Sequence, residues 1–169
     1  MVAETPDIHA DVLISCGDLP DEVILQAAAR VQCSCILAVK GNNDSATPFP
    51  APIIDLHLRT IAVKGIGFGG FNGCWKYEPN GHFLYEDSEA ARMLSSFPRV
   101  DVFVAHNSPQ LIHDKHDAVH KGFASFNAYI DRMHPRLFFH GHQHINAETL
   151  VGTTRVVGTI GHRYLTIEE

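Results

Sequence analysis

The sequence "FFHGHQHIN", residues 138–146, places His140, His142 and His144 within five positions, directly after an apolar run. Gly141 and Gln143 between them fill no core, so packing alone does not account for three imidazoles. Neutral imidazole is the commonest metal ligand in proteins, and glycine lets the backbone turn tightly enough for alternate side chains to converge. The spacing therefore indicates a metal site. A polar strand end with solvated histidines is the alternative for this stretch alone.

The composition around this stretch is that of an ordinary globular protein. The chain has 169 residues, of which 45% are hydrophobic and 19% charged, and we expect a single domain over residues 1–169. No apolar run is long enough to cross a membrane, and the start of the sequence lacks a signal-peptide pattern. The formal net charge of -6 argues against a broad nucleic-acid-binding surface.

Four cysteines are present: Cys16, Cys33, Cys35 and Cys74. Cys33 and Cys35 have one residue between them, whereas zinc and thioredoxin motifs have two. Cys16 lies in an apolar run, where a free thiol packs as a small hydrophobic group. We expect all four to be reduced, in a cytoplasmic protein, and none to be catalytic.

Apolar runs that end in polar residues recur along the first half of the chain. Residues 11–18 predict a buried strand, residues 19–31 a helix, and residues 33–44 a strand followed by a loop. This β-α-β order makes the two strands parallel. Alternation over residues 53–70 predicts a hairpin, and residues 69–85 read as a loop.

The second half repeats the pattern. We expect a helix over residues 87–97, capped by Asp87 or Ser88, and a strand followed by a loop over residues 99–109. Residues 107–121 form a long polar loop. Residues 123–133 place apolar side chains on one helical face, and Pro135 ends that helix before the strand that leads to His140. Short strands interrupted by glycine fill residues 146–167. The class is therefore α/β.

Polar groups stand just past the carboxyl ends of four predicted strands: Asp18, Asn42 to Asp44, His106, and His142 with His144. Ligands of open α/β sheets bind outside those strand ends, so we expect the groups to gather at one edge of one sheet. A mixed nitrogen and oxygen set suits Mn²⁺, Fe²⁺ or Zn²⁺. Each group alone has a simpler explanation. Asp18 could cap a helix, "GNND" could be a turn, and His106 could be a core histidine.

The ordered set of "GD" (17–18), "GNND" (41–44), His106 and "GHQH" (141–144) resembles the calcineurin-like metallophosphoesterases. The resemblance covers roughly residues 10–167, and "AHNSP" (105–109) is similar to the family's histidine followed by a proline-containing turn. It implies a four-layer α-β-β-α sandwich of two mixed sheets. It also implies that Asp18 bridges two divalent metal ions, that Asn42, His106 and His142 complete one of them, and that His144 belongs to the other.

The resemblance implies a metal-dependent phosphoesterase that hydrolyses phosphodiesters or small phosphate esters. Two cations about 3.5–4 Å apart can bridge a water, acidify it and hold the phosphoryl oxygens while the water attacks phosphorus. The charge that develops in the transition state falls on the metals and on nearby donors.

The first departure from the family lies between Asn42 and Asp44, where many members carry a histidine that helps to protonate the leaving group. This chain has Asn43, which cannot act as a general acid but can donate an amide hydrogen bond to phosphate. We take Asn43 and Asp44 as catalytic candidates and expect good leaving groups to be preferred. His113 is a candidate proton donor or phosphate contact, or else a solvated loop histidine. His82, His116, His120 and His162 are expected at the surface or in packing.

The second departure is at the start, where the family carries Asp-x-His on a first strand. The chain offers Asp7 and His9, but only eight residues separate His9 from Asp18, and these form the "GD" strand. Parallel neighbours need a dozen or more residues between them, so we reject Asp7 and His9 as ligands. We expect the first strand and its motif to be missing, and one tight metal ion or none to bind. We also expect an exposed sheet edge that favours a homodimer.

Two other functions stay open. The chain could be a catalytically weakened or inactive relative that serves as a binding module on the same fold. A mononuclear zinc hydrolase is less favoured, because asparagine is an unusual zinc ligand and no HExxH motif is present.

Overall fold

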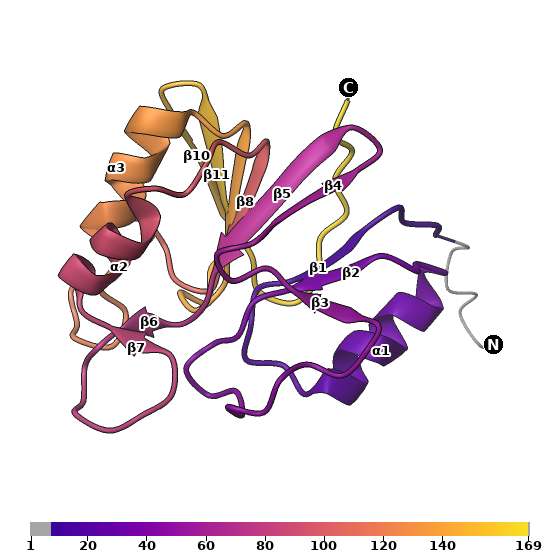
Figure 1. Cartoon of the computed structure of the whole chain (residues 1–169), viewed down its shortest axis with the longest axis horizontal. Helices are drawn as coiled ribbons and strands as arrows, with labels where there is room; N and C mark the ends of the chain where they lie inside the picture. The colour runs from indigo at the N-terminus through magenta and orange to yellow at the C-terminus, as the bar shows by residue number, and fades with distance from the viewer. Residues whose placement is uncertain (1–7, 169) are drawn as a thin grey trace.

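Two β-sheets face each other in the computed structural model, which describes residues 8–168 (Figure 1). The smaller sheet has three parallel strands in the order β1-β2-β3: β1 (Leu13–Ser15), β2 (Ile36–Ala38) and β3 (Ile53–Asp55). The larger sheet has the order β10-β11-β9-β8-β5-β4. Its strands are β4 (Thr60–Val63), β5 (Ile66–Phe71), β8 (Val102–Ala105), β9 (Leu137–His140), β10 (Ala147–Val151) and β11 (Thr154–Gly158). The larger sheet is mixed, since β4–β5 and β10–β11 are antiparallel pairs.

Helices cover the outer face of each sheet. α1 (Asp21–Arg30) packs on the smaller sheet, and α2 (Asp87–Leu94) and α3 (Ala124–Met133) pack on the larger one (Figure 1). This arrangement confirms the predicted α-β-β-α layers. Within residues 8–168, no helix has the length and apolar character needed to cross a membrane.

The alternation of side chains along the strands explains the layers. In β8, Val102 and Val104 belong to the apolar cluster between the sheets, whereas Phe103 and Ala105 belong to the cluster under α2 and α3. Successive side chains of a strand point to opposite faces, so an uninterrupted apolar run serves two cores at once. This is why the central strands read as continuous apolar runs in the sequence.

The start of α2 differs from the prediction. α2 is capped by Glu86, whose side chain accepts a backbone N–H, while Glu89 Oε2 accepts the Glu86 N–H at 2.8 Å. This reciprocal capping box replaces the expected cap by Asp87 or Ser88. Asp87 instead accepts the Ser125 N–H at 3.0 Å and ties α2 to α3.

The predicted hairpin over residues 53–70 is only half correct. β4 and β5 form a hairpin, but β3 leaves it and pairs in parallel with β2 in the other sheet. Ile53 of β3 is buried in the cluster under α1, so tertiary packing overrides the local alternation. The predicted loop over residues 69–85 contains the end of β5 and a small parallel pair, β6 (Cys74–Trp75) and β7 (Leu84–Tyr85).

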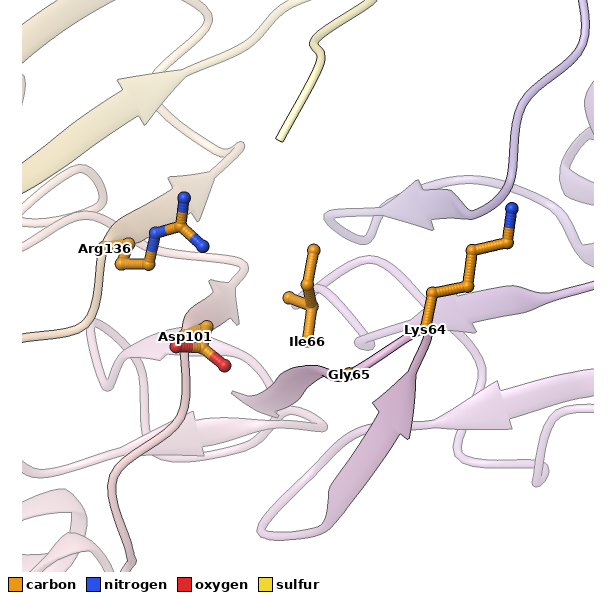
Figure 2. A pocket seen from close by; sticks show the side chains of 5 residues that line it. All are labelled: Lys64, Gly65, Ile66, Asp101 and Arg136. Atoms are coloured by element: carbon orange, nitrogen blue, oxygen red, sulfur yellow. The ribbon is translucent and has the colours of Figure 1, made fainter. Parts of the chain in front are cut away.

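The amino ends of β8 and β9 border a hollow of about 450 Å³, lined by Lys64, Gly65, Ile66, Asp101 and Arg136 (Figure 2). Its charged groups already have partners in the chain. Lys64 pairs with Asp11 at 2.5 Å, Asp101 accepts the Gly67 N–H at 2.8 Å, and Arg136 donates to the Glu168 carbonyl at 2.6 Å. His106, His142 and His144 follow the opposite, carboxyl ends of these two strands.

Candidate metal centre

Two glycines let the loops after β1 and β2 approach each other. A Cβ on Gly17 would lie 2.5 Å from the Gly41 amide nitrogen and 2.7 Å from His106 Nδ1. A Cβ on Gly41 would lie 2.0 Å from Asp18 Oδ1. Real Cβ atoms do not approach that closely, so only glycine at both positions allows Asp18 to lie against the second loop.

The other half of the site comes from the larger sheet. His106 directly follows β8, and His142 lies two residues after β9. The Gly141 N–H donates to the His106 carbonyl at 3.0 Å, which fixes the two strand ends together. The four predicted strand endings therefore do converge, but from two sheets. The expectation of one edge of one sheet is wrong, because the facing sheets end on the same side of the sandwich.

Each imidazole at the centre has one nitrogen bound to a backbone carbonyl. His106 Nδ1 lies 2.7 Å from the Cys16 carbonyl oxygen, and His142 Nε2 lies 2.8 Å from that of Val119. A carbonyl only accepts, so these two nitrogens carry the hydrogens and donate. His106 Nε2 and His142 Nδ1 then carry no hydrogen, and each has a free lone pair. These two nitrogen atoms lie 3.1 Å apart.

Two oxygens join these lone pairs. Asn42 Oδ1 lies 3.1 Å and Asp18 Oδ2 lies 3.5 Å from His106 Nε2. The Asn42 amide nitrogen donates away from the centre, to the Tyr77 hydroxyl at 3.2 Å. Neighbouring ligands of an octahedral ion with bonds of about 2.1 Å lie about 3.0 Å apart. The spacing of these four acceptors therefore suits the coordination sphere of one cation.

Burial supports the neutral form of both rings. Burial lowers the pKa of His106, which is 1% exposed, and it lowers the pKa of His142 to about 4. Both imidazoles are then unprotonated at neutral pH, as metal ligands must be. Asp18, His106 and His142 each offer a ligand atom, and these atoms lie within 4.8 Å of one another.

Three residues of this region have left-handed backbone conformations that are rare outside glycine. The φ angles are 58° at Asp18, 57° at His142 and 52° at His144. Such conformations carry strain, and they are found most often at functional sites.

Residues of the "GNND" loop (41–44) hold Asp18 in place through hydrogen bonds. Asp44 Oδ2 accepts the Asp18 N–H at 2.8 Å and the Gly41 N–H at 2.7 Å, so this carboxylate joins the two loops. Asn43 is exposed, and its backbone N–H and side-chain amide donate to the two oxygens of Asp18 at 2.8 and 2.7 Å. Asn43 therefore lies beside the cluster, and Asp44 lies behind it.

Three other sequence candidates lie apart from the four acceptors. His113 contacts His140 Nε2 through Nδ1 and Thr149 Oγ1 through Nε2, both at 2.9 Å. His140 is fully buried and also contacts the Gly141 carbonyl, and burial lowers its pKa to about 4. His144 is exposed, with its ring centre 6.3 Å from that of His120.

Asp7 lies outside the described residues. His9 is exposed and precedes β1, whereas Asp18 follows it, so the two lie at opposite ends of that strand.

Sequence reasoning missed two neighbours of the centre. His120 was expected at the surface or in packing and was given no part in the site, but its ring centre lies 5.2 Å from that of His142. Gln143 is buried, and its amide donates to Asn107, Ser108 and the His120 carbonyl at 2.9, 3.0 and 2.8 Å. The only local signal for His120 is an aspartate three residues before it, and no pattern shows where a long loop folds back.

These features define a calcineurin-like phosphoesterase: residues 1–162 match the model of the calcineurin-like phosphoesterase superfamily domain, and the chain belongs to this superfamily. No match to a curated protein was found.

Solved structures with a similar fold include TT1561 of Thermus thermophilus, with a TM-score of 0.57, 16% identity, and coverage of 88% of this chain and 76% of that one. A single mutant of Vps29 from Entamoeba histolytica has a TM-score of 0.45 and 12% identity, over 89% of this chain and 57% of that one. At 16% identity the first likeness shows the fold alone.

Proposed function

We propose that the chain is a metal-dependent phosphoesterase that hydrolyses phosphodiesters or small phosphate esters. One observation carries the proposal: four acceptor atoms converge with no hydrogen between them. Acceptors that face one another repel unless a cation lies among them. Membership of a superfamily whose members are generally hydrolytic phosphoesterases supports the same chemistry.

In this proposal Asp18, Asn42, His106 and His142 hold one divalent ion of the Mn²⁺, Fe²⁺ or Zn²⁺ class. The bound ion supplies an acidified water and positive charge for the phosphoryl oxygens. The carbonyls of Cys16 and Val119 fix the tautomers of the two rings. Outer contacts of this kind orient metal ligands and raise their basicity.

Asn43 contacts the substrate in this proposal. Its exposed side-chain amide lies 2.7 Å from Asp18 Oδ2, so it borders the proposed ion and can donate to a phosphoryl oxygen. Asp44 keeps the two loops in register through its contacts with the Asp18 and Gly41 amides. His113 is bound to His140 and Thr149 through both ring nitrogens, so we withdraw it as a proton donor.

The test measures metal content and hydrolysis of an aryl phosphate diester on the same preparation. We expect hydrolysis that a chelator removes and that Mn²⁺ restores, and we expect His106→Ala to lose both metal and activity. A parent protein that binds no divalent metal would contradict the proposal.

A binding module on the same fold is the second candidate. It is favoured by the finding that residues 8–168 contain one cluster of three or more His, Cys, Asp or Glu ligands, whereas the family uses two ions. The same assay separates the two functions, because a binding module would bind the first ion and hydrolyse no ester.

We also propose a cytoplasmic location and a homodimer. The four cysteines are unpaired, which suits a reducing compartment. Among the described strands, β1 is an outer strand of its sheet, and such edges pair readily with another copy. Sedimentation velocity tests the dimer, and a monomer at all concentrations would contradict it.

A further inference from the structure

Tyr77 contacts one of the four acceptor residues from outside the centre. The Asn42 side chain presents Oδ1 to His106 Nε2 at 3.1 Å, and its Nδ2 donates to the Tyr77 hydroxyl at 3.2 Å. The hydroxyl is therefore separated from the proposed metal centre by a single amide group. Tyr77 is half-buried, so part of its side chain remains open to solvent.

The hydroxyl of Tyr77 still has a hydrogen to donate. A phenol keeps its hydrogen at neutral pH and accepts through its oxygen, and the contact with Asn42 uses the oxygen alone. No described residue accepts the Tyr77 hydrogen. A donor is thus left free beside the proposed metal centre.

Residues 72–77 are tied to the "GNND" loop through the backbone. Both backbone groups of Lys40, the residue before that loop, bind to this segment. The Lys40 N–H donates to Asn72 Oδ1 at 2.8 Å, and the Lys40 carbonyl accepts the Gly73 N–H at 2.7 Å. Gly73 has a φ of 73°, and a Cβ there would lie 1.9 Å from the Phe83 carbonyl oxygen. The position of the segment is therefore set by the fold and does not depend on the tyrosine hydroxyl.

Neutral donors suit the charge of a phosphodiester. The cation of Lys40 is already paired, since its ammonium is buried 3.7 Å from Asp21 Oδ1 and 3.8 Å from the centre of the Phe49 ring. Asn43 supplies one neutral donor in the proposed site, through its exposed side-chain amide. A phosphodiester spreads one negative charge over two unesterified oxygens, and a second neutral donor can bind one of them.

Building on the proposed function, we propose that the Tyr77 hydroxyl binds the substrate by donating a hydrogen bond to an unesterified phosphoryl oxygen. The same hydroxyl accepts from Asn42, so it contacts a proposed metal ligand and the substrate at once. No proton is transferred, so Tyr77 does not replace the general acid that is missing at Asn43. Donors fixed in advance toward oxygens that gain negative charge in the transition state lower the barrier.

The test compares the parent with Tyr77→Phe, which removes the hydroxyl and keeps the ring. Calorimetry measures the Kd of Mn²⁺ and then the Kd of inorganic phosphate for the Mn²⁺-loaded protein, and circular dichroism verifies folding. We expect Tyr77→Phe to raise the phosphate Kd about fivefold or more, the usual effect of one lost hydrogen bond. We expect kcat/KM for an aryl phosphodiester to fall about tenfold or more. The Kd of Mn²⁺ should stay within about threefold, because all four proposed ligands remain.

Tyr85→Phe is the matched control. It removes a hydroxyl from the neighbouring strand β7 that makes no hydrogen bond to another described residue. We expect it to change neither Kd nor the rate of hydrolysis.

The outcomes separate this inference from the proposed function. An unchanged phosphate Kd in Tyr77→Phe would overturn the inference, whatever the rate of hydrolysis. A Mn²⁺ Kd raised about tenfold or more would also overturn it, because Tyr77 would then act by orienting Asn42. A loaded parent that binds no phosphate would overturn the inference alone. A parent that binds Mn²⁺ and phosphate but hydrolyses no ester would overturn the proposed hydrolysis, and the phosphate Kd of Tyr77→Phe would still decide the role of Tyr77. A parent that binds no Mn²⁺ would overturn both.

Discussion

His106 Nε2 and His142 Nδ1 lie 3.1 Å apart, and in each ring the N–H of the other nitrogen donates to a backbone carbonyl oxygen. Neither of the two facing atoms therefore carries a hydrogen. A pair of core histidines would place a hydrogen between them, because a buried acceptor without a donor is destabilising. The carbonyls of Cys16 and Val119 therefore fix tautomers in which the two rings cannot hydrogen-bond to each other but can both bind one cation.

His142→Ala is expected to lower bound metal and any hydrolysis at least tenfold, because it removes a ligand from a four-donor set. His140→Ala is expected to do less, since His140 contacts His113 and the Gly141 carbonyl. Elemental analysis of the two variants and the parent measures the difference. Equal metal content in all three proteins would refute the assignment.

Gly41→Ala is expected to remove metal binding and to destabilise the fold by about 1–3 kcal/mol, the usual cost of overpacking. The new methyl group would meet Asp18 Oδ1 at 2.0 Å. Gly67→Ala is the matched control, because its nearest contact would be an ordinary 3.5 Å. Urea denaturation and metal titration of both variants provide the comparison, and an intact metal site in Gly41→Ala would show that the loops can separate.

The metal-free protein is expected to lose stability as the pH falls from 6.5 toward 4. Burial lowers the pKa of His140 from 6.5 to about 4, so the unfolded chain binds the extra proton in this window. For His140 the loss is about 2 kcal/mol at pH 5. Urea denaturation in chelator at pH 7 and pH 5 measures the loss, and His140→Gln should reduce it. If His140→Gln lost as much stability between pH 7 and pH 5 as the parent, the pH dependence would come from groups other than His140.

Hydrolysis is expected to favour aryl diesters over alkyl monoesters, because Asn43 cannot protonate a leaving group. The measurement is kcat/KM across esters whose leaving groups differ in pKa. We expect the rate to fall as that pKa rises. A flat series, with chemistry shown to limit the rate, would mean that another group supplies the proton.

The residues whose grouping could be predicted best are those that lie within a few residues of a strand's carboxyl end. Asp18, Asn42, His106 and His142 could be placed together because strand ends are legible from apolar runs and parallel strands align their carboxyl ends. The sequence could not show that these residues come from two sheets, because an apolar run predicts a buried strand without indicating the sheet to which it belongs. The pairing of β3 with β2 was missed for that reason, since it depends on tertiary contacts such as those of Ile53 under α1.

The outer contacts of the site were least predictable. The Val119 carbonyl and the ring of His120 reach His142 from a long loop whose course depends on tertiary hydrogen bonds, such as those of Gln143. The contact of His113 with Thr149 could not be predicted for the same reason, because Thr149 lies 36 residues further along the chain. The local sequence does not indicate hydrogen bonds between residues so far apart in the chain.

The left-handed backbone at Asp18, His142 and His144 lowers the stability of the fold at positions where the proposed site needs these side chains. Each such residue costs about 1–2 kcal/mol that glycine would avoid. A laboratory selection for heat resistance alone would thus enrich glycine at these positions. The selected proteins would be more stable, but they would bind no metal and hydrolyse no ester. Directed evolution of this scaffold therefore needs a catalytic or metal-capture screen in every round.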